Sequence, residues 1–66
     1  MEQQNEQTII TENFAIRVYK TGRGVIAEVA DSHSPFNGVY VLASVRAYAV
    51  SMLLDKVAEL RALQVA

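Results

Sequence analysis

Residues 43–64 constrain the fold more than any other part of the chain, because they form a helix-like segment whose apolar side chains cover an unusually wide arc. No proline or glycine follows Gly38, so no residue in this segment breaks a helix. On a helical wheel at about 100° per residue, one apolar strip contains Val45, Ala49, Leu53, Leu60 and Leu63. A second strip beside it contains Ala47, Val50, Leu54 and Val57.

Together the two strips exceed what one helix needs in order to cover one small sheet. A helix on the surface of a domain requires an apolar arc of about 100° or slightly more, and these strips span roughly twice that arc. We therefore expect the surplus to contact a second subunit. The residues predicted at this oligomer interface are Ala47, Val50, Leu54, Val57, Leu60 and Leu63.

The length of the chain supports the same expectation. A chain of 66 residues forms at most one domain, and a domain of this size buries only about 60% of its unfolded surface. Small domains usually add disulfides, a metal or oligomerisation. The chain has no cysteine, and its one histidine, His33, is too few for a metal site within a single chain. Self-association remains, most simply as a homodimer, and we expect no cofactor.

Charge and hydropathy predict a cytoplasmic protein that does not enter a membrane. The net charge is −1, which is not the charge of a typical nucleic-acid-binding protein. Residues 1–7 are rich in Gln and Glu and do not resemble a secretory signal. The apolar run at residues 39–54 is too short to span a bilayer, and it contains Arg46.

Three strands are expected before the helix. Residues 1–7 are polar and are predicted to be a disordered tail, which leaves one domain at residues 8–66. From Thr8 to Tyr19 apolar and polar side chains alternate with period two, so one half-buried strand is expected there. Two glycines in residues 21–24 predict a tight hairpin, in which both adopt positive φ. Residues 25–31 form the return strand, and residues 38–42 form the third.

The predicted fold is therefore α+β: a three-stranded antiparallel β-meander followed by one long C-terminal helix, completed by oligomerisation. Ser44 is the expected N-cap of the helix. About 20 helical residues span roughly 30 Å, whereas a strand of about seven residues spans roughly 23 Å. We therefore expect the last turns of the helix to extend beyond their own sheet.

Residues 31–34 contain the side-chain types of a hydrolase triad, in Asp31, Ser32, His33 and Ser34. Catalysis requires these groups to converge on one point, and adjacent residues rarely do so, which makes a polar surface loop the better interpretation. A second alternative is a metal held at a dimer axis by Asp31 and His33 from two copies. Nothing in the sequence requires such a site. We expect no catalytic and no metal-binding residues.

A basic hairpin is the one candidate for contact with a partner or with phosphate. Arg17, Lys20 and Arg23 follow one another with no acidic residue between them. These residues could bind phosphate, with Tyr19 and Tyr40 stacking on bases. Alternatively, they only keep an exposed strand soluble. The sequence leaves both interpretations open, although nucleic acid is not the expected partner.

The order hairpin, third strand and long helix resembles the small domain of HicB-like antitoxins over residues 14–60. The likeness is one of element order. That family has a Pro-Asp-Leu-Pro-Gly-like segment where this chain has residues 31–35, and a Gly-Asp-Thr-like turn where it has residues 41–44; neither motif is present. The resemblance implies a protein that binds and neutralises a toxin.

These observations predict a non-catalytic protein-interaction module. We expect an oligomeric regulator or inhibitor of another protein, of the kind found in phages and mobile elements. The alternative is a nucleic-acid-binding accessory or antitoxin-type protein that uses the basic hairpin.

Overall fold

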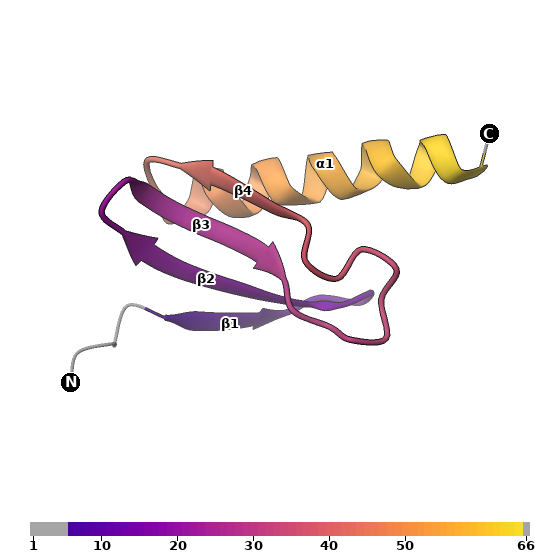
Figure 1. The fold of residues 1–66 in the computed structure, drawn as a ribbon, viewed down its shortest axis with the longest axis horizontal. Helices are drawn as coiled ribbons and strands as arrows, with labels where there is room; N and C mark the ends of the chain where they lie inside the picture. The colour runs from indigo at the N-terminus through magenta and orange to yellow at the C-terminus, as the bar shows by residue number, and fades with distance from the viewer. Residues whose placement is uncertain (1–5, 66) are drawn as a thin grey trace.

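The computed structural model describes residues 6–65, which form four strands and one helix. The strands are β1 (Gln7–Ile10), β2 (Ala15–Thr21), β3 (Gly24–Val29) and β4 (Tyr40–Ala43), and the helix is α1 (Arg46–Val65). The strands pair antiparallel in the order β1-β2-β3-β4, and α1 packs on one face of the sheet (Figure 1). The α+β class and the meander followed by a helix are as predicted.

The number of strands was predicted wrongly, because the expected first strand is two strands. Thr11 is the residue that reverses the chain. Its hydroxyl donates to the carbonyl of Phe14 at 2.7 Å and accepts from the amide of Phe14 at 3.1 Å. Residues 11–13 (TEN) are all polar, and Glu12 takes a position that an unbroken strand would give to an apolar residue, so the sequence marks this turn although the prediction carried one strand through it. The reversal brings β1 back along β2, where Gln7 pairs with Val18.

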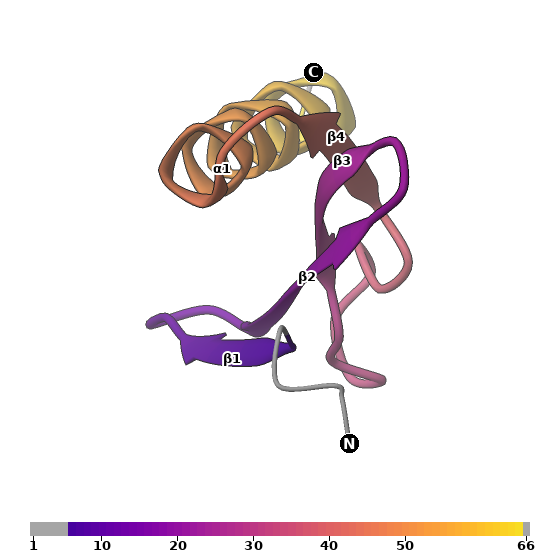
Figure 2. The same cartoon turned by 90° about the vertical axis from the view of Figure 1, so that its left-hand side faces the viewer.

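The same reversal shortens the predicted tail. Gln7 belongs to β1, and Glu6 lies 3.8 Å from the guanidinium of Arg17. Residues 1–5 of the predicted tail lie outside the described residues. Figure 2 shows β1 at the end of the twisted sheet that is remote from α1.

The predicted tight hairpin joins β2 to β3, with Gly22 and Arg23 between the strands. The hydroxyl of Thr21 accepts from the amide of Arg23 at 3.1 Å and donates to the carbonyl of Gly24 at 3.0 Å. Of the two hairpin glycines, only Gly24 has positive φ, at 147°. The expectation for Gly22 was therefore wrong.

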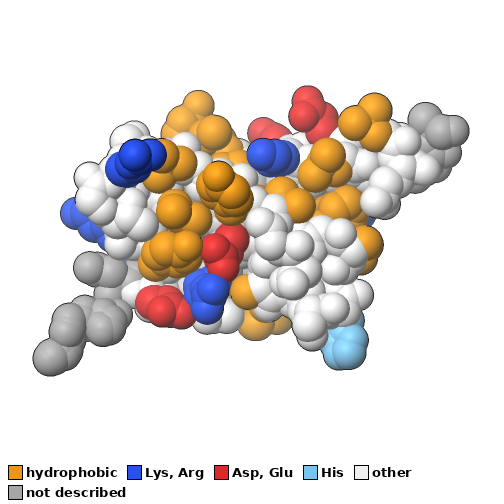
Figure 3. Space-filling model, viewed as in Figure 1, with side chains coloured by type: hydrophobic (Ala, Val, Ile, Leu, Met, Phe, Trp, Pro, Cys, Tyr) orange, Lys and Arg blue, Asp and Glu red, His pale blue; other side chains and the backbone are white. Residues whose placement is uncertain are grey.

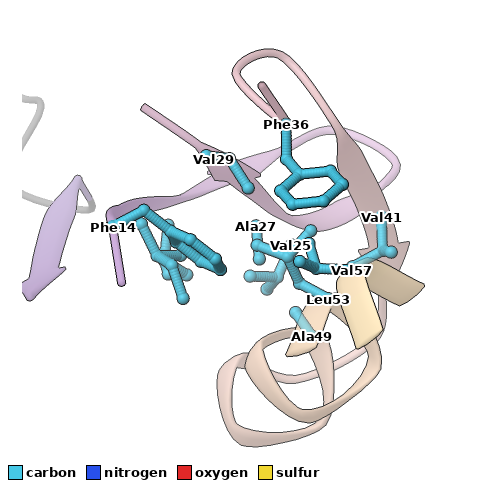
Figure 4. Close-up of a cluster of buried hydrophobic side chains, with 11 residues drawn as sticks. Phe14, Val25, Ala27, Val29, Phe36, Val41, Ala49, Leu53 and Val57 are labelled. Carbon is cyan, nitrogen blue, oxygen red and sulfur yellow. The ribbon is translucent and has the colours of Figure 1, made fainter. Parts of the chain in front are cut away.

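The core lies between the inner face of the sheet and α1 (Figure 4). β2 and β3 bury alternate side chains, as period two requires. The buried apolar residues are Phe14, Ile16, Val18, Val25, Ala27, Val29, Phe36, Val41, Ala49, Leu53 and Val57. This face of the sheet is thus closed within a single chain.

The helix begins slightly later than predicted and extends beyond the sheet. The amide of Ala49 donates to the carbonyl of Val45 at 3.0 Å, which makes Val45 rather than Ser44 the residue that flanks the first turn. α1 contacts β3 and β4 more than β2. Its C-terminal turns pass the end of the sheet (Figure 1), and Leu63 is 72% exposed. The expected overhang is present.

Candidate interaction surfaces

The residues predicted at an oligomer interface do not share one surface. Val57 is only 3% exposed, so it belongs to the core and its prediction as an interface residue is corrected. Val50 and Leu60 are half-buried against the same core. Ala47, Leu54 and Leu63 are exposed. Val57 appeared to be surplus because the sequence does not show how far around α1 the sheet reaches.

Leu54 and Leu63 lie on opposite sides of α1. They are nine residues apart, which at about 100° per residue corresponds to half a turn. Lys56, on the same side as Leu63, donates from Nζ to the carbonyl of Tyr40 in β4 at 3.5 Å. The opposite side, which we call the helix flank, consists of Ala47, Val50 and Leu54. The helix flank therefore points away from β4.

The structure also separates the three basic residues of the hairpin. Arg17 and Lys20 are three residues apart in β2, so their side chains leave opposite faces of the sheet. Arg23 lies in the turn. Lys20 and Arg23 are exposed. The predicted basic surface is therefore not a single patch.

Arg17 is held within the sheet by Glu28, its cross-strand partner. The nitrogen Nη2 of Arg17 lies 2.6 Å from Oε2 of Glu28. This hydrogen bond, together with the charge of Glu28, raises the pKa of Arg17 above its ordinary value. The carboxylate of Glu28 therefore compensates much of the positive charge of Arg17 within the chain itself.

The outer face of the sheet, opposite α1, carries an apolar patch. Tyr19, Ile26 and Leu42 pair across β2, β3 and β4 and form one row. Tyr40 lies in the next row, beside Glu28. We call Tyr19, Ile26, Tyr40 and Leu42 the open-face patch. Figure 3 shows hydrophobic side chains gathered over β2–β4, next to a basic side chain flanked by acidic ones.

The polar groups at the border of the open-face patch bind one another. The hydroxyl of Tyr19 donates to Oε1 of Glu28 at 3.0 Å, while Arg17 occupies Oε2. The guanidinium of Arg17 also lies 5.9 Å from the centre of the Tyr19 ring. The hydrogen bond to Glu28, followed by burial, raises the pKa of Tyr19 above its ordinary value. These three residues form one neutral cluster.

The loop between β3 and β4 uses its polar side chains to hold its own backbone. Asp31 Oδ1 accepts from the amide of His33 at 3.0 Å, and Ser34 Oγ accepts from the amide of Phe36 at 3.1 Å. Such bonds are typical of turns. The side chain of Phe36 is buried and anchors the loop to the core. Within residues 6–65 no three His, Asp or Glu side chains are grouped as a metal ion would require.

Comparison of the chain with protein families, with curated proteins and with solved structures finds no match. In the described part of the chain, no helix has both the length and the apolar character needed to cross a membrane.

The sequence interpretation missed the open-face patch, although the sequence contained a signal for it. Strands that are half-buried alternate apolar with polar residues, yet β3 (GVIAEV) and β4 (YVLA) carry apolar residues on both faces. In β3 the outward residue Ile26 is as apolar as its inward neighbours Val25 and Ala27. Apolar residues on both faces of a strand predict that the second face is also covered.

Proposed function

We propose that this chain is a non-catalytic protein-interaction module that self-associates and regulates or inhibits a second protein. The observation that carries this proposal is the amount of large apolar surface that the chain leaves exposed on both of its sides. Among residues 6–64, the exposed large hydrophobic residues are Ile10, Tyr40, Leu42, Val45, Tyr48, Leu54 and Leu63. Contiguous exposed apolar surface is typical of sites that bind proteins.

The distribution of this surface favours more than one contact. Tyr40 and Leu42 lie on the outer face of the sheet, whereas Leu54 lies on the helix on the other side. One surface can hold a second copy while the other binds a different protein. Two separate apolar surfaces are what an oligomeric regulator requires, because one of them holds the copy and the other holds the regulated protein.

Sedimentation of the full-length chain at micromolar concentrations tests the self-association. We expect a species heavier than the 7.3 kDa chain, and a fraction of this species that grows with concentration. A 7.3 kDa species at every concentration, combined with a cooperative melt, would contradict the proposal.

A nucleic-acid-binding function is the second candidate, because Tyr19 and Tyr40 both lie on the outer face of the sheet. Aromatic side chains on a sheet can stack on bases. Phosphate, however, requires positive charge beside such a platform. Here Arg17 is paired with Glu28 and has Glu6 as a second acidic neighbour. The surface beside Tyr19 and Tyr40 therefore lacks the free positive charge that phosphate requires, and a protein is the favoured partner.

A further inference from the structure

We infer that the open-face patch is the self-association surface, and that its occupant is the same patch of a second copy of this chain. The inference rests on the proposed self-association and adds the surface that makes it. In the resulting dimer two sheets pack face to face, and one helix lies on each outer side. Sheets packed in this way lie about 10 Å apart, with side chains of both faces in contact.

The first argument is that the patch can be buried without leaving a charge unpaired. A buried charge is costly unless it is paired and hydrogen-bonded. Glu28 meets this condition, because Arg17 occupies one carboxylate oxygen and the hydroxyl of Tyr19 occupies the other. Only 20% of the Glu28 side chain is exposed, whereas the Arg17 side chain is 45% exposed. Arg17 lies next to Glu6, and we therefore place it at the border of the contact.

The second argument concerns the choice of partner. A two-fold dimer places a surface against an identical surface, so a patch with excess charge of one sign would repel its copy. Tyr19, Ile26, Tyr40 and Leu42 carry no charge, Arg17 and Glu28 compensate each other beside them, and Glu6 lies beyond Arg17 at the border of the contact. Two copies of the open-face patch can therefore meet without repulsion between like charges. A strongly acidic or strongly basic partner would find no complementary charge there.

The third argument is the shape of the two surfaces. Tyr19, Ile26 and Leu42 form a continuous row across three strands, with Tyr40 beside it. On the helix flank, Leu54 is the one large exposed apolar residue, because Val50 is half-buried and Ala47 is small. The open-face patch thus offers the wider apolar contact, and the helix flank remains accessible in the dimer.

Two leucines provide a matched test. Leu42 is 42% exposed in the open-face patch, and Leu54 is 41% exposed on the helix flank. We expect Leu42→Asp to raise the dimer dissociation constant by roughly 100-fold, because it places an unpaired carboxylate in a buried contact. Leu54→Asp should leave the constant within about threefold of the original. Sedimentation equilibrium measures both constants, and circular dichroism verifies that each variant folds.

A second set of variants keeps the test decisive if Leu42→Asp fails to fold. Arg17→Glu places two carboxylates at the border of the patch and should weaken the dimer, whereas Arg17→Glu combined with Glu28→Arg restores the pair and should restore the dimer. If the original chain associates but Leu54→Asp alone dissociates it, the inference is wrong and the proposed self-association stands. If the original chain does not associate at all, both are wrong.

Discussion

Gly24 is the residue whose backbone tolerates a side chain least. Its φ of 147° lies in a region that residues with a Cβ rarely adopt. A Cβ at this position would also lie 2.6 Å from the carbonyl oxygen of Ala43 in β4. Gly24 therefore permits the hairpin to turn and allows β4 to approach β3.

We expect Gly24→Ala to lower the free energy of unfolding by about 1–3 kcal/mol, because it strains the backbone and displaces β4. Gly22→Ala is the matched control, because no atom lies within 4 Å of a Cβ there and its φ is not positive. This control should change stability by less than about 1 kcal/mol. Urea denaturation measures both. Equal losses in the two variants would contradict this account of Gly24.

Tyr19 should ionise at higher pH than an ordinary tyrosine, because its hydroxyl donates to the Glu28 carboxylate. The pKa of Tyr19 is higher in the folded chain than in the unfolded chain, so its contribution to stability is complete below the ordinary pKa of 10.0. That contribution is lost as the pH rises through the pKa of the folded state. The chain should therefore become less stable in this alkaline range.

Absorbance of the phenolate tests this prediction in a variant that combines Tyr40→Phe with Tyr48→Phe and so retains Tyr19 as its single tyrosine. Adding Glu28→Gln should lower the pKa of Tyr19, since the carboxylate that accepts its hydrogen bond is removed. An identical titration curve with and without Glu28→Gln would show that the bond does not control Tyr19.

At the scale of secondary structure, α1 shows how two adjacent leucines acquire different roles. Leu53 is fully buried against the sheet, whereas Leu54 is exposed on the helix flank. A rotation of about 100° separates them. One turn of α1 thus contributes Leu53 to the core and Leu54 to the exposed helix flank.

Leu53→Ala should reduce the free energy of unfolding by about 2–5 kcal/mol, as expected for a leucine that leaves a cavity in a core. Leu54→Ala should reduce it by less than about 1 kcal/mol, because its side chain is already in solvent. Chemical denaturation of both variants at one protein concentration provides the comparison. A larger loss for Leu54→Ala would mean that α1 is rotated about its axis relative to this structure.

At the scale of the whole molecule, the two proposed interaction surfaces lie on opposite sides of the sheet. The open-face patch covers one side, and the helix flank belongs to the helix on the other. A protein bound at one surface need not displace a protein bound at the other. The three basic residues, by contrast, are divided between the two faces and the turn, and do not form a third surface.

We therefore expect no measurable binding to oligonucleotides at physiological salt. Changing Arg17, Lys20 and Arg23 together to Gln should weaken the dimer, because Glu28 loses its ionic partner, and should leave binding to a different protein intact. Fluorescence anisotropy with single- and double-stranded oligonucleotides at several salt concentrations tests the expectation. Micromolar affinity that falls steeply with salt and disappears in the triple variant would overturn it.

Local patterns were sufficient to predict much of the architecture. Alternation with period two identifies β2, because this pattern reports which side chains share a face. The lack of proline and glycine after Gly38 allows the long helix α1 to be predicted. Two glycines at residues 21–24 identify the hairpin, because few other residues allow so tight a turn. Leu53, which belongs to the first apolar strip of the helical wheel, is buried. Each of these predictions depends only on neighbouring residues.

Tertiary structure decided the features that depend on residues far apart in the sequence. The polar residues 11–13 mark a break in the pattern, but only the pairing of Gln7 with Val18 shows that the chain reverses there and that β1 is a separate strand. Val57 is in the core because the sheet extends beneath it, and Arg17 is compensated because register places it beside Glu28. A sequence pattern determines which side chains share a face, whereas the position of the next element in space determines which faces are covered and which charges meet.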